Sequence, residues 1–189
     1  MLAMLAAPDA IARERKVLVM GDSLSAAYGL RPEQGWVALA DAKSDKYGFH
    51  NASISGETSA GGRSRIADEL KRVRPDIVVI ELGANDGLRG LPLKQMGANL
   101  GWMIGSAKAA GARVLLIGLQ LPPNFGVYAR DFQRSYALIA QRLDTGLIPH
   151  FLAPLGVERN WFQADNLHPV AEAQPLLADE VLAALDALP

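Results

Sequence analysis

The stretch DIVVIEL, residues 76–82, contains an unbroken run of β-branched residues from Ile77 to Ile80. Such a run is typical of a parallel strand covered on both faces, because apolar and polar residues do not alternate along it. The apolar runs at residues 16–20 and 113–119 have the same character. Weaker strand candidates lie at 51–54 and at 147–151, where Pro149 suits an edge strand.

Longer stretches with helical spacing separate these runs. The spacing predicts helices over residues 35–47, 59–73, 93–110, 128–143 and 170–188, with Gly48 and Gly111 as stops for the first and third. Strand and helix therefore alternate about five times, which demands a parallel sheet with right-handed crossovers. We expect an α/β fold, a three-layer α/β/α sandwich with a five-stranded parallel sheet of the flavodoxin-like type.

Length and composition narrow the function classes. The 189 residues suit one domain, are 50% hydrophobic and 21% charged, and carry a net charge of −1. Without a basic excess there is no electrostatic case for a nucleic-acid partner. The chain has no cysteine, which excludes disulfides, thiolate metal sites and a cysteine nucleophile.

The N-terminal residues 1–14 stand apart from the expected domain at 15–189. Residues 1–7 are apolar and Ala10-Ile11-Ala12 looks like a small-residue cleavage site, but no positive charge precedes the apolar run. The segment is expected to be a tail or the remnant of an export signal. An export signal would place the protein in the periplasm or outside the cell, and the cytoplasm is the alternative. The apolar runs are far shorter than the ~20 residues of a membrane-spanning helix, so no stable membrane insertion is expected.

Ligands of such sheets bind beyond the carboxyl ends of the strands, so the segments that follow the strands are expected to carry the functional residues. Ser23, in GDSLS at 21–25, is either a nucleophile with a base nearby or a helix cap. Gly56 offers an unhindered backbone N–H or is a turn glycine. Asn85, in GANDG at 83–87, is either an amide donor to an oxyanion or part of an Asn-Asp-Gly turn.

Near the C-terminus, Asp165 stands three residues before His168. On a turn entering a helix, this carboxylate can reach the imidazole Nδ1 and leave Nε2 free to take a proton from a serine. Alternatively, Asp165 caps a helix and His168 is incidental. A metal pair is a third possibility, but no further His or Cys cluster supports it, and no metal is expected.

Together these motifs resemble the four blocks of the GDSL, or SGNH, hydrolases. The blocks are Gly21-Asp22-Ser23-Leu24, Gly56, Gly83-x-Asn85-Asp86 and Asp165-x-x-His168. The longer strings NASISG at 51–56, ELGANDGLRG at 81–90, LPPNFG at 121–126 and His168-Pro169 are similar to the bacterial thioesterase I / protease I / lysophospholipase (arylesterase) branch.

The resemblance implies a serine esterase that works through an acyl-serine intermediate and needs no cofactor. It implies Ser23 as nucleophile, His168 as base and Asp165 as the orienting acid. It also implies an oxyanion hole made by the N–H groups of Ser23 and Gly56 and the Asn85 side chain. The expected partners are small acyl or aryl esters of short to medium chain, with acyl thioesters and lysophospholipids as further substrates, and the expected state is a monomer or weak homo-oligomer.

Substrate contacts are expected along the same rim. Leu88 follows the third strand, and the loop at 121–126 follows the fourth; either they form an apolar wall for the substrate or they plug the core. The expected contacts are Asp22, Leu24, Leu88, Pro122, Pro123 and Phe125. Two other functions stay open: a carbohydrate O-deacetylase of the same superfamily, and a non-catalytic flavodoxin-like nucleotide-binding module, which the lack of G-x-G-x-x-G and of a P-loop disfavours.

Overall fold

The structure is a computed structural model and describes residues 14–156 and 158–188. Five parallel strands form one sheet in the order β2-β1-β3-β4-β5. This is the flavodoxin-like order, as expected. The strands are β1 (Arg15–Gly21), β2 (Tyr47–Asn51), β3 (Ile77–Glu81), β4 (Arg113–Ile117) and β5 (Gly146–Ile148).

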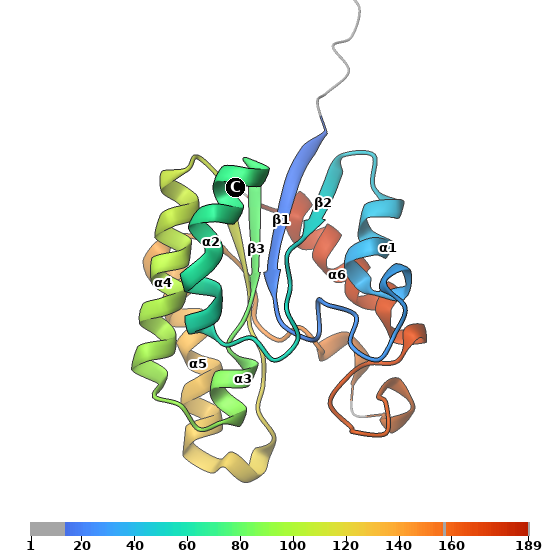
Figure 1. The fold of residues 1–189 in the computed structure, drawn as a ribbon. Helices are drawn as coiled ribbons and strands as arrows, with labels where there is room; N and C mark the ends of the chain where they lie inside the picture. The colour runs from blue at the N-terminus through green and yellow to red at the C-terminus, as the bar shows by residue number, and fades with distance from the viewer. Residues whose placement is uncertain (1–13, 157, 189) are drawn as a thin grey trace, which may run out of the picture.

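Helices cover both faces of the sheet and make the three layers (Figure 1). On one side, α1 (Trp36–Lys43) packs against α6 (Gln174–Asp186), and on the other, α4 (Leu93–Ala109) lies between α2 (Ser59–Val73) and α5 (Gly126–Leu143). A short helix, α3 (Ala84–Leu88), follows β3 directly. Short 3-10 helices lie at Pro32–Gln34, Pro123–Phe125, Ala153–Leu155, Arg159–Trp161 and Ala171–Ala173.

The middle of the sheet is the centre of the core. Val17 of β1 lies opposite Phe49 of β2 on one side and Ile77 of β3 on the other. Every residue of β3 is buried, which is the environment that the β-branched run predicts. The chain leaves β1 and β3 toward opposite edges of the sheet, so their carboxyl ends form the topological switch point where such folds bind ligands.

The helix expected over residues 35–47 ends earlier, at Lys43. Ser44 has an extended backbone (φ −109°, ψ 130°), and its Oγ accepts hydrogen bonds from the N–H groups of Lys46 (3.2 Å) and Tyr47 (3.1 Å). A serine that bonds to nearby backbone in this way competes with a further helical turn.

The strand expected at 51–54 was placed wrongly, because β2 begins at Tyr47 and ends at Asn51. Tyr47 is buried, and its hydroxyl donates to Asp186 of α6 at 3.0 Å, so its apolar ring belongs to the strand and not to the preceding helix. Gly48, expected to stop that helix, lies inside the strand.

The remaining elements differ from expectation only near their ends. β4 stops at Ile117, and β5 stops at Ile148, just before Pro149. The last helix begins at Gln174 behind a 3-10 turn, with Pro175 in its first turn, where a missing N–H costs nothing. The expected export-signal remnant at 1–14 lies, apart from Glu14, outside the described residues. Within the described part of the chain, none of the helices has the length and apolar character needed to cross a membrane.

Candidate active site

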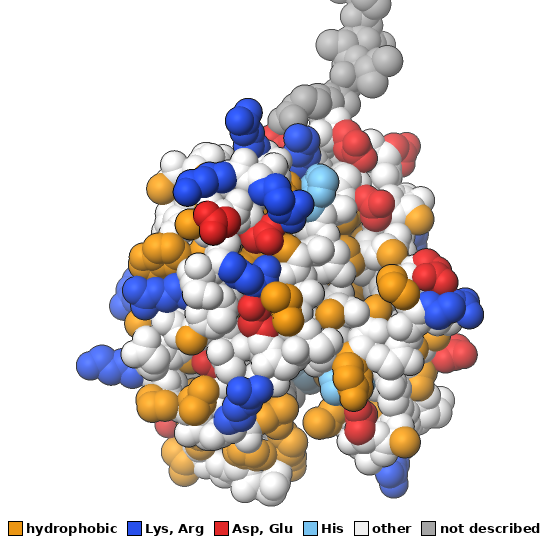
Figure 2. Space-filling model, viewed as in Figure 1, with side chains coloured by type: hydrophobic (Ala, Val, Ile, Leu, Met, Phe, Trp, Pro, Cys, Tyr) orange, Lys and Arg blue, Asp and Glu red, His pale blue; other side chains and the backbone are white. Residues whose placement is uncertain are grey.

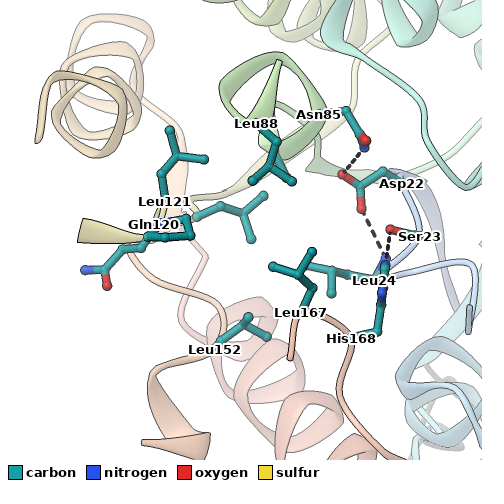
Figure 3. A pocket seen from close by; sticks show the side chains of 13 residues that line it. Asp22, Ser23, Leu24, Asn85, Leu88, Gln120, Leu121, Leu152, Leu167 and His168 are labelled. Atoms are coloured by element: carbon teal, nitrogen blue, oxygen red, sulfur yellow. Dashed lines mark hydrogen bonds between the residues drawn. The ribbon is translucent and has the colours of Figure 1, made fainter. Parts of the chain in front are cut away.

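Three polar side chains from two distant parts of the sequence meet at the carboxyl end of the sheet, and Figure 3 shows two of them, Ser23 and His168. Ser23 follows β1, whereas Asp165 and His168 lie in the loop before α6. The His168 Nε2 lies 2.8 Å from the Ser23 Oγ, and the His168 Nδ1 lies 2.6 Å from an Asp165 carboxylate oxygen. The three groups therefore form one continuous chain of hydrogen bonds.

The carboxylate of Asp165 also stabilises the loop in which Asp165 lies. The second carboxylate oxygen accepts from the backbone N–H groups of Leu167 (2.9 Å) and His168 (3.1 Å). Desolvation alone would raise the pKa of Asp165, but the hydrogen bonds from the imidazole and from these two N–H groups outweigh it and lower the pKa to about 2. Asp165 is therefore ionised at neutral pH.

Beneath the serine lies a buried carboxyl group, Glu81, at the end of β3. One of its oxygens accepts from the Ser25 Oγ at 2.8 Å and from the backbone N–H of Asp22 at 3.3 Å. These contacts tie the turn that carries Ser23 to the central strand. Glu81 belongs to none of the predicted site residues, although a carboxylate at the end of an otherwise apolar buried strand is itself a signal.

Burial raises the pKa of two neighbouring carboxyl groups, Asp22 and Glu81. Desolvation raises the pKa of Asp22 to about 6, against the lowering effect of hydrogen bonds from the Leu24 N–H and the Asn85 amide. Desolvation, together with the nearby Asp22, raises the pKa of Glu81 well above its ordinary value. Two buried acids this close do not both ionise readily, so each carboxylate favours the protonated form of the other.

Two of the three expected oxyanion donors come from other segments, Asn85 from the short helix α3 and Gly56 from the loop after β2. The Asn85 Nδ2, at the start of α3, donates to the Asp22 carboxylate at 3.0 Å. Gly56 follows β2 with φ of +80°, a conformation that favours glycine, and its carbonyl accepts from the Arg89 guanidinium at 3.0 Å. Gly56 is not one of the residues that line the cavity beside Ser23, which is described below. Its role as a donor stays a prediction.

The segments that carry Gly56 and Asn85 are also joined through a third buried acid. Asp86 accepts hydrogen bonds from the backbone N–H (2.7 Å) and from the Oγ (2.6 Å) of Ser59, the first residue of α2. The Asn99 side chain of α4 donates to the same Oγ at 3.0 Å. This network fixes the start of α2 against α3.

A cavity of about 220 Å³ opens beside Ser23 and His168. The surface is hollowed at this end of the molecule, and hydrophobic side chains gather beside the hollow over α3 and the start of α5 (Figure 2). Most of the wall is apolar. The cavity is lined by Asp22, Ser23, Leu24, Ala84, Asn85, Leu88, Leu119, Gln120, Leu121, Pro122, Leu152, Leu167 and His168.

Two expected wall residues do not line this cavity. Pro123 and Phe125 belong to a 3-10 helix that turns the loop away after Pro122, and the Phe125 ring packs beside Tyr128 with 6.4 Å between centroids. Leu152, which follows β5, takes their place in the wall. No motif pointed to Leu152, because its position depends on how the loop after β5 folds back over the sheet.

The arrangement offers nucleophilic chemistry. Among residues 14–156 and 158–188, no three His, Asp or Glu side chains are grouped so that they could hold a metal ion. A serine bonded to a histidine that is itself oriented by a carboxylate is the constellation that activates a hydroxyl for attack on a carbonyl. The site can therefore perform acyl transfer through Ser23.

The chain matches a known protein family and is similar to characterised proteins. The model of the GDSL-like Lipase/Acylhydrolase family matches residues 19–174. The chain is 47% identical over 175 residues to Esterase TesA of Pseudomonas aeruginosa, which covers 90% of this chain and 87% of that protein. It is 40% identical over 165 residues to thioesterase 1/protease 1/lysophospholipase L1 of Escherichia coli K12, covering 86% of this chain and 79% of that protein.

A solved structure supports the same relation. The psychrotrophic esterase EstA from Pseudoalteromonas, inhibited by monoethylphosphonate, superposes with a TM-score of 0.87 at 40% sequence identity. The match covers 92% of this chain and 97% of that one. The structural similarity therefore extends over nearly the whole length of both chains.

Proposed function

Because this chain belongs to the GDSL-like lipase/acylhydrolase family and is a serine ester hydrolase, we propose that Ser23, His168 and Asp165 perform its reaction as nucleophile, base and orienting acid. The observation that carries the proposal is the continuous hydrogen-bond chain from the Ser23 Oγ through His168 to Asp165. The apolar cavity beside Ser23 is the site for the substrate.

Acylation begins when the Ser23 Oγ attacks the carbonyl carbon of the ester. His168 Nε2 takes the hydroxyl proton, and the carbonyl electrons move to the oxygen to give a tetrahedral oxyanion. When the oxyanion collapses, the bond to the leaving group breaks and His168 returns the proton to it. The acyl group is then held on Ser23 as an ester, and Asp165 stabilises the imidazolium that exists between the two proton transfers.

The oxyanion is stabilised by hydrogen-bond donors fixed before the reaction begins. We assign the backbone N–H groups of Ser23 and Gly56 and the Asn85 Nδ2 to this role. Support comes from Asn85, which lines the cavity and whose amide is already oriented by Asp22. Fixed donors of this kind need no reorganisation as charge develops, and loss of one typically costs about 10²–10³ in rate.

Deacylation repeats the sequence with water in place of the serine. His168 takes a proton from the water, whose oxygen attacks the acyl carbon. The second oxyanion collapses, the bond to Ser23 breaks, and His168 returns the proton to the Ser23 Oγ. The carboxylic acid leaves and the free enzyme is restored.

The wall of the cavity suits the acyl part of the substrate. Leucines surround a volume that is smaller than the ~300 Å³ at which typical ligand pockets begin, which favours short to medium acyl chains over long ones. We propose aryl esters and short to medium acyl esters as substrates. Acyl thioesters and lysophospholipids are further candidates, since a relative at 40% identity is named for both activities.

Hydrolysis of p-nitrophenyl esters of increasing chain length tests this function. We expect activity that peaks at a short or medium chain, loss of nearly all turnover in Ser23→Ala, and normal turnover in Ser64→Ala, whose hydroxyl donates within α2 at a distance from the site. An alkylphosphonate should label Ser23 alone. Labelling of a different serine, or a Ser23→Ala variant that keeps its turnover, would refute the mechanism, and faster turnover of acetylated sugars than of acyl esters would favour a deacetylase.

The cellular setting is a separate proposal. We propose that the enzyme acts in the periplasm or outside the cell, on the apolar pattern of residues 1–12, and that it is a monomer or a weak homo-oligomer. Cell fractionation with N-terminal sequencing tests the location, and recovery of the intact chain in the cytoplasm would contradict it. Sedimentation at several concentrations tests the oligomeric state.

A further inference from the structure

A large aromatic side chain outside the motifs stacks on His168. The Tyr28 ring lies 4.4 Å from the imidazole, centroid to centroid, with 37° between the planes. The Tyr28 side chain is 51% exposed, and its hydroxyl has no hydrogen-bond partner among the described residues. The half-exposed Tyr28 ring is therefore not needed to fill the core. Its distinctive contact is the one with the imidazole of His168.

The backbone holds Tyr28 in place on both sides. Ala27 has φ of +57° and Gly29 has φ of +74°, so the chain is left-handed immediately before and after Tyr28. A left-handed alanine carries a cost that a flexible surface loop would relax. The Tyr28 N–H also donates to the Ser23 carbonyl at 3.1 Å. The turn that presents the nucleophile therefore also presents the ring.

A single glutamine joins this turn to the loop of the histidine. The Gln163 Nε2 donates to the carbonyls of Tyr28 (2.9 Å) and Pro169 (3.1 Å), while its backbone N–H donates to the carbonyl of His168 (2.8 Å). A Cβ on Gly29 would lie only 2.2 Å from the Gln163 Oε1, so glycine is needed there for the close approach. The two rings are thus held against each other by fixed backbone contacts.

We propose that Tyr28 is a positioning residue for His168, whose ring face restrains the imidazole and favours the imidazolium that forms during acyl transfer. A cation within about 6 Å of an aromatic centroid is attracted by the negative face of the ring. Ser23 and Asp165 fix the edges of the imidazole, and Tyr28 covers a face of it. The inference rests on the proposed role of His168 as base.

The proposal predicts an effect on turnover and not on substrate binding, because Tyr28 does not line the cavity. Tyr28→Leu removes the ring and should lower kcat about five- to thirtyfold with KM within about twofold, as expected for an interaction of this class. Tyr28→Phe keeps the ring and should stay within about twofold of the wild type. These assays use a short-chain p-nitrophenyl ester and the full-length enzyme.

A matched control is Trp102→Leu. Trp102 is also a half-exposed aromatic, 42% exposed, and it stacks with a cation, the Arg63 guanidinium, at 5.4 Å. It lies on α4, away from the cavity. This variant loses the same kind of surface contact and should keep the wild-type kcat.

Proton NMR of the imidazoles provides a readout independent of activity. The chain has three histidines, His50, His150 and His168, and His168→Asn assigns the third set of signals. Protons above an aromatic face are shifted upfield, so Tyr28→Leu should move the His168 signals downfield. Unchanged His50 and His150 signals would show that the fold is intact.

The outcomes separate the two proposals. Normal kcat in Tyr28→Leu, with the His168 signals shifted, would overturn the inference while Ser23→Ala still reports on the proposed function. An equal loss in Tyr28→Phe would assign the effect to the hydroxyl and also overturn it. Loss of kcat in Tyr28→Leu with rescue in Tyr28→Phe, normal turnover in Trp102→Leu and a shift confined to His168 would establish it.

Discussion

The Asn85 side-chain amide donates a 3.0 Å hydrogen bond to the carboxylate of Asp22, the residue immediately before Ser23. Asp22 is fully buried, and its other carboxylate oxygen accepts from the Leu24 N–H at 3.1 Å. The Asn85 Nδ2 carries two hydrogens, so this bond occupies one and leaves the other for a substrate oxygen. The acid beside the nucleophile therefore orients the proposed oxyanion donor.

Asp22→Asn tests this relationship. An asparagine offers one acceptor where the aspartate offers two, so either the Leu24 N–H or the Asn85 amide faces an NH₂ group. We expect kcat to fall about ten- to hundredfold, less than for complete loss of a donor, with little change in KM. Steady-state kinetics and a thermal melt measure the two effects, and a wild-type kcat would show that Asp22 does not orient Asn85.

Asn85→Ala removes the donor itself. We expect kcat to fall about 10²–10³ with KM nearly unchanged, because the bond to the oxyanion strengthens only as charge develops. Gln141→Ala, which removes an exposed amide of α5, is the control and should leave kcat unchanged. If kcat in Asn85→Ala fell less than threefold, Asn85 would have to be removed from the oxyanion hole.

Asp165→Asn tests the orienting acid without disturbing its loop. The asparagine keeps the oxygen that accepts from the Leu167 and His168 N–H groups but turns an NH₂ toward the imidazole Nδ1. The favoured imidazole tautomer then places a hydrogen on Nε2, which can no longer take the Ser23 proton. We expect kcat to drop at least a hundredfold, which is less than at a fully buried triad because the Asp165 side chain is 38% exposed. Unchanged kcat would reduce Asp165 to a cap of its loop.

The fold was largely predictable because its core strands are chemically distinct. Residues 77–80 and 114–117 are buried on both faces, and that environment selects unbroken apolar runs. β2 lies next to β1 at an edge of the sheet and is half exposed, so its mixed sequence did not indicate a strand. The hydroxyl of Ser44, which interrupts the preceding helix, acts through two local hydrogen bonds that periodicity does not reveal.

The site residues whose type is restricted by their proposed chemistry could be predicted from the sequence. The residues that reach the site only because of the conformation of a loop could not. Ser23 and Asn85 directly follow strands and His168 precedes the last helix, all in recognisable motifs, and the fold brings their side chains together. Leu152 and Tyr28 carry no motif, and their positions depend on how loops fold over the sheet. Phe125 is apolar, as expected for a cavity wall, but it lies on a 3-10 helix outside the lining of the cavity.

Glu81→Gln tests the buried acid through stability. Burial raises the pKa of Glu81 in the native state above its unfolded value, so between these two pKa values the native state binds more protons. The free energy of unfolding therefore falls as pH rises through that window. Glutamine keeps an acceptor for the Ser25 Oγ and removes the titration. We expect the variant to lose less stability than the wild type as pH rises above the ordinary range of a carboxyl group in urea denaturation, and parallel losses would show that burial does not raise the pKa of Glu81.

Leu152→Trp tests the cavity as the acyl site. Leu152 points into the cavity from the side opposite Leu88, so a larger ring there shortens the space available to a chain (Figure 3). Each buried CH₂ contributes about 0.8 kcal/mol, or roughly fourfold in kcat/KM, so exclusion of two or three of them should cost about fifteen- to sixtyfold.

We therefore expect Leu152→Trp to lose kcat/KM on octanoyl esters while acetyl esters stay near the wild type. The control is Leu138→Trp, which enlarges a leucine that is 51% exposed on α5 and should leave the whole chain-length profile unchanged. The comparison uses p-nitrophenyl esters, so the leaving group is constant and only the acyl chain varies. An equal loss on acetyl and octanoyl esters would mean that Leu152 supports the catalytic loops, and the acyl chain would have to lie outside the cavity.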